Sequence, residues 1–109
     1  MARRAWMRAA PRYRLFQPGT MVATGAATRV HLLDLSLNGA LLHAVEPPAP
    51  GSIVRLAAGE GLGAARVVWS RGRRFGVAFA APLAPDRLER VAAGHLALAR
   101  RIAGVGTLR

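Results

Sequence analysis

The sequence contains no cysteine and no lysine, and it has few acidic or aromatic residues and no long apolar run. The absence of cysteine excludes disulfide bonds and thiolate metal sites. The three histidines, His31, His43 and His95, do not have the spacing of metal ligands, so we expect no metal site and no cofactor. No apolar stretch suits a secretory signal or the roughly 20 residues of a membrane-spanning helix. We therefore expect a single cytoplasmic domain of residues 1–109.

A catalytic site is not indicated either. The sequence has no inferable nucleophile–base pair, no pair of carboxylates and no cluster of metal-binding residues. Asp34 and Ser36 are close together in the chain, but no histidine can be placed beside them. We therefore expect the protein not to be an enzyme.

Positive charge dominates the composition. All sixteen basic residues are arginine, against five acidic residues, and the formal net charge is +11. Such a charge indicates an anionic partner. Arginine suits this role because its planar guanidinium binds phosphate, or the O6/N7 edge of guanine, through two parallel hydrogen bonds. The alternative is that the arginine content reflects the composition of the genome, and both interpretations stay open for most of these residues.

The N-terminal segment holds five of the arginines within its first 14 residues. Pro11 rules out a continuous helix there, so we predict a flexible or loosely ordered arm over residues 1–16. Two pairs of arginines have the spacing Arg-x-x-x-Arg, namely Arg4 with Arg8 and Arg8 with Arg12. The alternative is a solvated basic tail without a specific role.

Six short segments with strand character follow, separated by turn signals. Gln17-Pro18-Gly19 predicts a turn before the first of them. The predicted strands are residues 20–24, 29–35, 39–45, 52–57, 62–70 and 74–80. In the last strand Phe75, Val77 and Phe79 share one face at period 2, which indicates a packed interior on that side. The pattern predicts a mainly β fold, either an antiparallel barrel or a sandwich.

The period becomes helical after Pro85. Apolar or aromatic residues recur at spacings of three and four and form one stripe, made of Leu88, Val91, His95, Leu98 and Ile102. Pro85 suits the start of a helix and Gly104 its end, so we predict a C-terminal helix over residues 84–104. This helix is expected to cover the barrel or to pair with a partner helix, which leaves a homodimer possible.

The segment of residues 34–39, Asp-Leu-Ser-Leu-Asn-Gly, connects the second and third predicted strands. In extended geometry Asp34 and Ser36 project to one side, and Gly39 allows a ligand or a backbone to come close. A carboxylate can accept hydrogen bonds from the N1–H and exocyclic amine of guanine. The same residues also suit an ordinary turn, in which Asp, Ser and Asn side chains bond their own backbone.

In their order along the chain, these features resemble the PilZ domain family. Residues 8–12, Arg-Ala-Ala-Pro-Arg, match the family's first motif, and residues 34–39 match its second. A Val-Val-Trp strand at 67–69 and a Phe-Gly-Val-Ala-Phe strand at 75–79 follow in the same order. The resemblance implies a six-stranded antiparallel β-barrel over residues 17–83, with the C-terminal helix and the N-terminal basic arm attached.

The resemblance implies a bacterial receptor for the second messenger cyclic di-GMP, which signals to a partner protein of unknown identity. Arg8 and Arg12 would contact phosphate and the O6/N7 edge of guanine. Asp34 and Ser36 would face the Watson–Crick side of the base or hold the arm in place, and Gly39 would permit close approach.

Two further residues, Arg14 and Asn38, are candidates for additional ligand contacts. The sequence departs from the family at Leu41, where many members have another arginine. It also has Met7 where an arginine tends to accompany the binding of a ligand pair, so one ligand per chain is expected.

The alternative is a degenerate barrel that does not bind cyclic di-GMP. Such a barrel would act as a protein-interaction adaptor or as a basic nucleic-acid-binding module. Nucleic-acid-binding barrels usually present aromatic stacking platforms, whereas Phe75 and Phe79 are assigned here to the core. We therefore expect neither nucleic acid nor a membrane as the partner.

Overall fold

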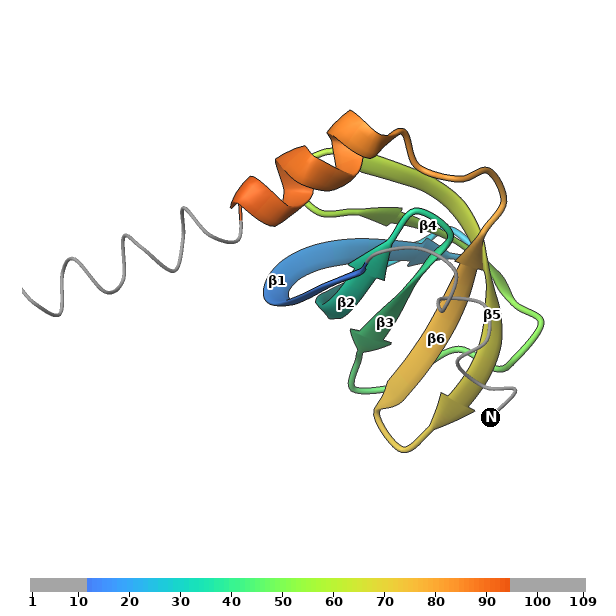
Figure 1. Ribbon diagram of the computed structural model, residues 1–109. Coiled ribbons are helices and arrows are strands. Elements are labelled where there is room, and N and C mark those ends of the chain that lie inside the picture. Colours follow the sequence, from blue (N-terminus) through green and yellow to red (C-terminus); the bar gives the residue numbers. More distant parts are fainter. Residues whose placement is uncertain (1–11, 95–109) are drawn as a thin grey trace, which may run out of the picture.

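A computed structural model describes residues 12–94 of the protein. Its strands are β1 (Arg12–Ala23), β2 (Ala26–Ser36), β3 (Gly39–His43), β4 (Ile53–Ala57), β5 (Gly61–Arg71) and β6 (Arg74–Phe79), and residues 85–94 form a helix. The strands close into an antiparallel barrel in the order β1-β2-β3-β6-β5-β4 (Figure 1). The mainly β, six-stranded barrel with a C-terminal helix is therefore confirmed, and the sandwich is excluded.

The first strand begins earlier than expected. β1 includes residues 12–16, which were assigned to the loose arm, and the segment Gln17-Pro18-Gly19, which was wrongly predicted to turn. β1 pairs with β2 along most of its length but with β4 only at Thr20–Val22. At Pro18, therefore, β1 has a neighbouring strand on one side only, and such an edge-like position tolerates proline.

Gly19 belongs to this strand because of the contact between β1 and β4. A Cβ atom at Gly19 would lie 2.6 Å from the carbonyl oxygen of Ala57. The glycine therefore serves the close approach of two strands rather than a turn.

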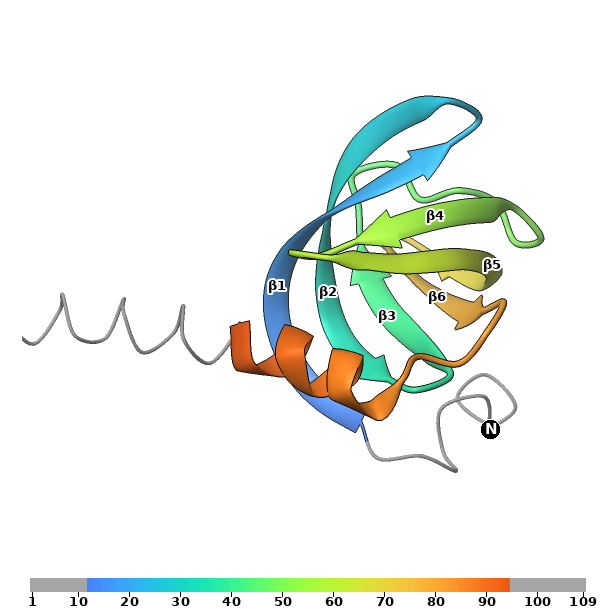
Figure 2. The same ribbon diagram turned by 90° about the horizontal axis from the view of Figure 1, so that it is seen from above.

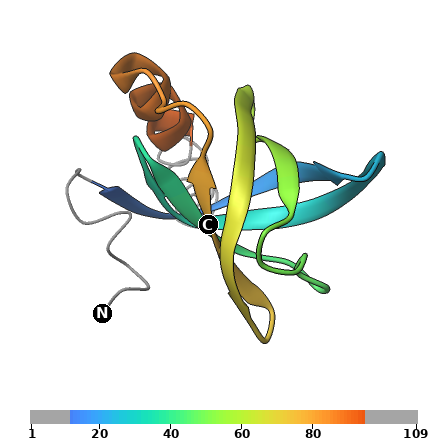
Figure 3. The same ribbon diagram turned by 90° about the vertical axis from the view of Figure 1, so that its right-hand side faces the viewer.

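The turn between β1 and β2 is also shorter than the interval of residues 25–28 that separates the first two predicted strands. It consists of Thr24 and Gly25 alone, with φ angles of 49° and 82°, between the paired residues Ala23 and Ala26. Two consecutive positive φ angles are typical of the type I′ hairpin, whose twist matches the flanking strands. A β-branched threonine is unusual there, so the sequence does not indicate that the turn begins at Thr24. The hairpin extends beyond the barrel in Figure 2 and Figure 3.

The core lies inside the barrel and under the helix. Phe75, Val77 and Phe79 of β6 are all buried in one apolar cluster, which confirms the alternation predicted for this strand. Leu88 and Val91 of the helix join the same cluster. The helix therefore covers one end of the barrel, as Figure 1 shows. The rest of the predicted stripe, from His95 onward, lies outside the described residues.

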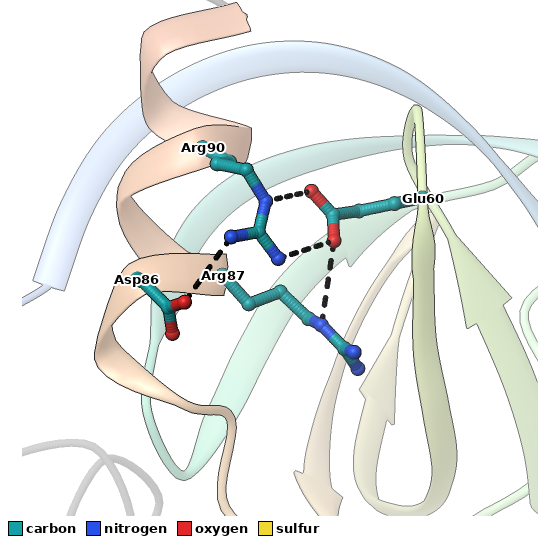
Figure 4. Close-up of polar contacts among 4 residues, drawn as sticks. All are labelled: Glu60, Asp86, Arg87 and Arg90. Carbon is teal, nitrogen blue, oxygen red and sulfur yellow. Dashed lines mark hydrogen bonds and ion pairs between the residues drawn. The ribbon is translucent and has the colours of Figure 1, made fainter.

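An ion-pair network fixes the helix to the turn between β4 and β5 (Figure 4). Arg90 donates two hydrogen bonds to the carboxylate of Glu60, from Nε to Oε2 at 2.9 Å and from Nη2 to Oε1 at 3.0 Å. Arg87 Nε lies 3.4 Å from Glu60 Oε1. Within the helix, Arg90 Nη1 also donates to Asp86 Oδ2 at 3.3 Å. This network joins residues 30 positions apart in the chain.

Replacing Glu60 with glutamine is expected to lower the melting temperature slightly at neutral pH. The hydrogen bond from Arg90 lowers the pKa of Glu60 below its ordinary value of 4.5. A carboxylate with a lowered pKa stabilises the fold above its unfolded pKa, and this contribution is lost as the pH falls through the folded value. The difference between wild type and Glu60→Gln, followed by thermal denaturation, should therefore vanish at acidic pH. The effect is small because exposed ion pairs contribute little.

The matched control is Glu89→Gln. Glu89 is an exposed acid on the same helix that forms no ion pair with residues 12–94. An equal change in melting temperature for both variants at neutral pH would contradict a stabilising role for the Glu60 network.

Candidate ligand-binding face

The pairing of β1 with β2 brings the arginines and the polar motif together. Arg12 lies opposite Ser36, and Arg14 lies opposite Asp34. Directly opposed residues of an antiparallel pair have their side chains on the same face of the sheet. Leu35, between the two polar residues, is fully buried in the core, so the four polar side chains lie on the outer face of the barrel.

A row of paired residues continues from this point across the outer face. Asp34 pairs with Leu41 of β3, Leu41 pairs with Gly76 of β6, and Gly76 pairs with Trp69 of β5. Leu41 is buried, yet it does not belong to the core cluster, which agrees with a position on the outside. The sequence places Trp69 in a strand whose Val-Val-Trp order contributes to the family resemblance, but it assigns Trp69 no role at the site. Its place beside the site follows from the register and not from any local signal.

The outer face is hollowed around Asp34. A cavity of about 380 Å³ is lined there by Arg14, Leu15, Leu33, Asp34, Leu41 and Arg74. The carboxylate residue Asp34 is only 6% exposed, and Leu15 and Leu41 are equally buried, so these residues form the floor. The two arginines are exposed and form the rim. A buried charge is costly unless a cation or hydrogen-bond donors accompany it, and Arg14 lies directly opposite Asp34.

Ser36 organises the turn between β2 and β3. Its Oγ accepts hydrogen bonds from the backbone N–H groups of Asn38 and Gly39 and donates to the Gly39 carbonyl oxygen, all at 3.3 Å. The side chain is fully buried. The ordinary turn chemistry considered for this segment is therefore present at Ser36, while Asp34 lines the cavity.

The rest of the barrel holds this turn from the other side. The N–H of Phe79 donates to the Asn38 carbonyl oxygen at 2.9 Å, and the N–H of Leu83 donates to the Leu37 carbonyl oxygen at 2.8 Å. Gly39 is buried in β3 opposite Ala78, whereas Asn38 is exposed at the tip of the turn. The candidate ligand-binding residues Asn38 and Gly39 thus lie beside β6. The candidate Arg8 lies outside the described residues.

An aromatic cluster lies further along β1, β2 and β3. Phe16 is 60% exposed, and its ring stacks on His31 with centroids 4.5 Å apart and an interplanar angle of 12°. His31 also pairs with His43, whose ring centroid is 6.5 Å away. The next pairing partner of His43 is Arg74, so this cluster borders the cavity. Within residues 12–94, no group of three or more acidic or histidine side chains could hold a metal ion.

The outer face is strongly basic. The register places on it, besides Asp34, the exposed arginines Arg12, Arg14, Arg66, Arg71 and Arg74. A face with this excess of guanidinium groups and one buried carboxylate suits a ligand that carries both negative charge and hydrogen-bond donors. No helix among residues 12–94 has the length and hydropathy to cross a membrane.

A small closed β-barrel with a basic, hollowed outer face suits a ligand-binding domain. A family model, that of the PilZ domain, matches residues 7–94, which is most of the chain. The protein is therefore a member of the PilZ domain family, whose domains are generally receptors for cyclic di-GMP. No curated protein matches the chain.

Proposed function

We propose that this protein is a receptor that binds cyclic di-GMP on the outer face of the barrel and passes the signal to a partner protein. The observation that supports this most directly is the β1–β2 register, which places Arg12 and Arg14 opposite Ser36 and Asp34. Arg12 of the first motif and Asp34 of the second, more than twenty residues apart in the sequence, thereby lie on one surface beside a cavity.

Each group in this arrangement has a partner on a guanine nucleotide. The buried carboxylate of Asp34 accepts from the N1–H and the exocyclic amine of the base. A guanidinium donates to guanine O6 and N7, or to phosphate oxygens, and we assign these contacts to Arg12 and Arg14. Ser36 contributes by holding the turn. Gly39, which has no side chain, permits the close approach of the ligand, and Asn38 offers an exposed amide beside it.

We assign a further contact to Arg8. It precedes Arg12 by four residues, so about 14 Å of extended chain is available for its side chain to reach the same face. A hydrogen bond to a charged group contributes about 1.5–3 kcal/mol, and micromolar affinity requires about −8 kcal/mol. A few such contacts together with base stacking therefore suffice, after the cost of ordering the ligand and the chain around it.

Calorimetric titration of the full chain with cyclic di-GMP tests this function. We expect a dissociation constant in the low micromolar range, one ligand per chain, and about tenfold weaker binding by Arg12→Ala, which is the loss of about 1.4 kcal/mol. The matched control is Arg55→Ala, since Arg55 is an exposed arginine on β4 that does not line the cavity. Absence of binding by the wild type at about 100 μM ligand, or about −5.5 kcal/mol, would exclude the receptor function for this chain.

A further inference from the structure

Arg74 has a position that no sequence motif indicates. It begins β6 and pairs with His43, two positions from the pair formed by Gly76 and Leu41. Arg74 and Leu41 are therefore diagonal neighbours on the outer face, within reach of a long side chain. Both residues line the 380 Å³ cavity that also contains Asp34 and Arg14.

Positive charge predominates around Arg74, although the carboxylate of Asp34 lines the same cavity. Arg74 forms no ion pair with an acidic side chain of residues 12–94. Its partner across the β5–β6 hairpin is Arg71, and Arg73 lies in the turn between them. Like charges directly opposite each other destabilise a strand pair, so an anion bound at this end of the cavity would relieve a repulsion already present in the fold.

The depth of the cavity distinguishes two parts of a ligand. Asp34, Leu15 and Leu41 form a buried floor that suits a flat, partly apolar base. Arg14 and Arg74 form an exposed rim, where a phosphate keeps part of its hydration while it gains a charged partner. The rim therefore suits the phosphodiester better than the base.

We propose that Arg74 is a further ligand-binding residue, whose guanidinium contacts a phosphate of cyclic di-GMP at the rim of the cavity. It thereby provides, from β6, a cation close to Leu41, where β3 offers only an apolar side chain. This inference rests on the proposed binding of cyclic di-GMP and adds a residue to the same site.

The test is a set of calorimetric titrations of the full chain with cyclic di-GMP. Arg74→Ala is expected to weaken binding about tenfold, which corresponds to the loss of one charged contact. The matched control is Arg73→Ala. Arg73 directly precedes Arg74 and carries the same charge, but it does not line the cavity. We expect this control to change the dissociation constant less than about twofold, because exposed charges outside the site are screened by solvent and salt.

Arg74→Lys tests the assignment to phosphate. Lysine keeps the point charge but not the planar fork, so it should retain most of the affinity for phosphate and little for a base edge. If wild type binds and Arg74→Ala binds as tightly as Arg73→Ala, the role of Arg74 is overturned while the proposed function stands. Equal losses for lysine and alanine would overturn the phosphate contact. If wild type does not bind, the proposed function and this role fall together.

Discussion

Asp34→Asn is expected to weaken the binding of cyclic di-GMP about 100-fold, the largest effect of any single substitution at the site. The two side chains have nearly the same shape, so the cavity is preserved. The change replaces one acceptor oxygen by an N–H₂ donor, which then faces an N–H donor of guanine on the buried floor. A buried donor without an acceptor costs more than the hydrogen bond that was lost.

The same substitution should also reduce selectivity for the base. Adenine does not present the N1–H and exocyclic 2-amine pair that a carboxylate accepts, so wild type is expected to discriminate against cyclic di-AMP. Titration of wild type and Asp34→Asn with cyclic di-GMP and cyclic di-AMP measures this selectivity as the ratio of the two dissociation constants. Asp86→Asn is the control, because it makes the same chemical change at an exposed site on the helix. Equal affinity of Asp34→Asn and wild type for cyclic di-GMP would rule out the assigned role of this carboxylate.

Phe75→Ala is expected to lower the free energy of unfolding by about 3–5 kcal/mol. Phe75 is fully buried and is among the largest side chains of the core. It lies on β6, which pairs with β3 on one side and with β5 on the other. Loss of the phenyl ring therefore leaves a cavity that the neighbouring strands cannot easily close. Because a domain of this size has a total stability of roughly 5–15 kcal/mol, urea denaturation should show a large shift of the midpoint.

Phe16→Ala is the control for this substitution. The same side chain is removed, but Phe16 is 60% exposed and contacts His31 on the outside of the barrel. We expect its effect on the unfolding free energy to stay below about 1 kcal/mol. Comparable destabilisation by the two variants would mean that the barrel interior is not the main source of stability.

Core and site alternate along the same strand. Phe75 points into the barrel, while Arg74 before it and Gly76 after it belong to the outer face. The packing of Phe75 therefore holds the strand that presents Arg74 to the cavity. Because one-residue slips in register exchange the two faces of a strand, a well-packed core is also what keeps the side chains of the proposed site outside.

The sequence by itself determined the class of fold and singled out Arg14 and Asp34, two of the residues that line the cavity. Alternation at period 2 is a local property, so β6 and its buried face could be predicted from Phe75, Val77 and Phe79. The third, fourth and fifth strands were placed within one or two residues for the same reason. The carboxylate at Asp34 and the hydroxyl at Ser36 were singled out from their spacing, and the turn chemistry at Ser36 was one of the two interpretations considered.

Only the tertiary structure decided which residues meet. β1 starts at Arg12 because residues 12–14 pair with residues 34–36 at the far end of β2. This contact has no signal in the local sequence pattern. Arg74 lines the cavity because of the register between β3 and β6, and Trp69 lies opposite Gly76 because of the register between β5 and β6, which includes a bulge that no periodicity reveals. Glu60 and Arg90 likewise meet only after the helix has docked. Side-chain type and alternation are written in neighbouring residues, whereas register and closure of a barrel depend on pairing between residues far apart in the chain.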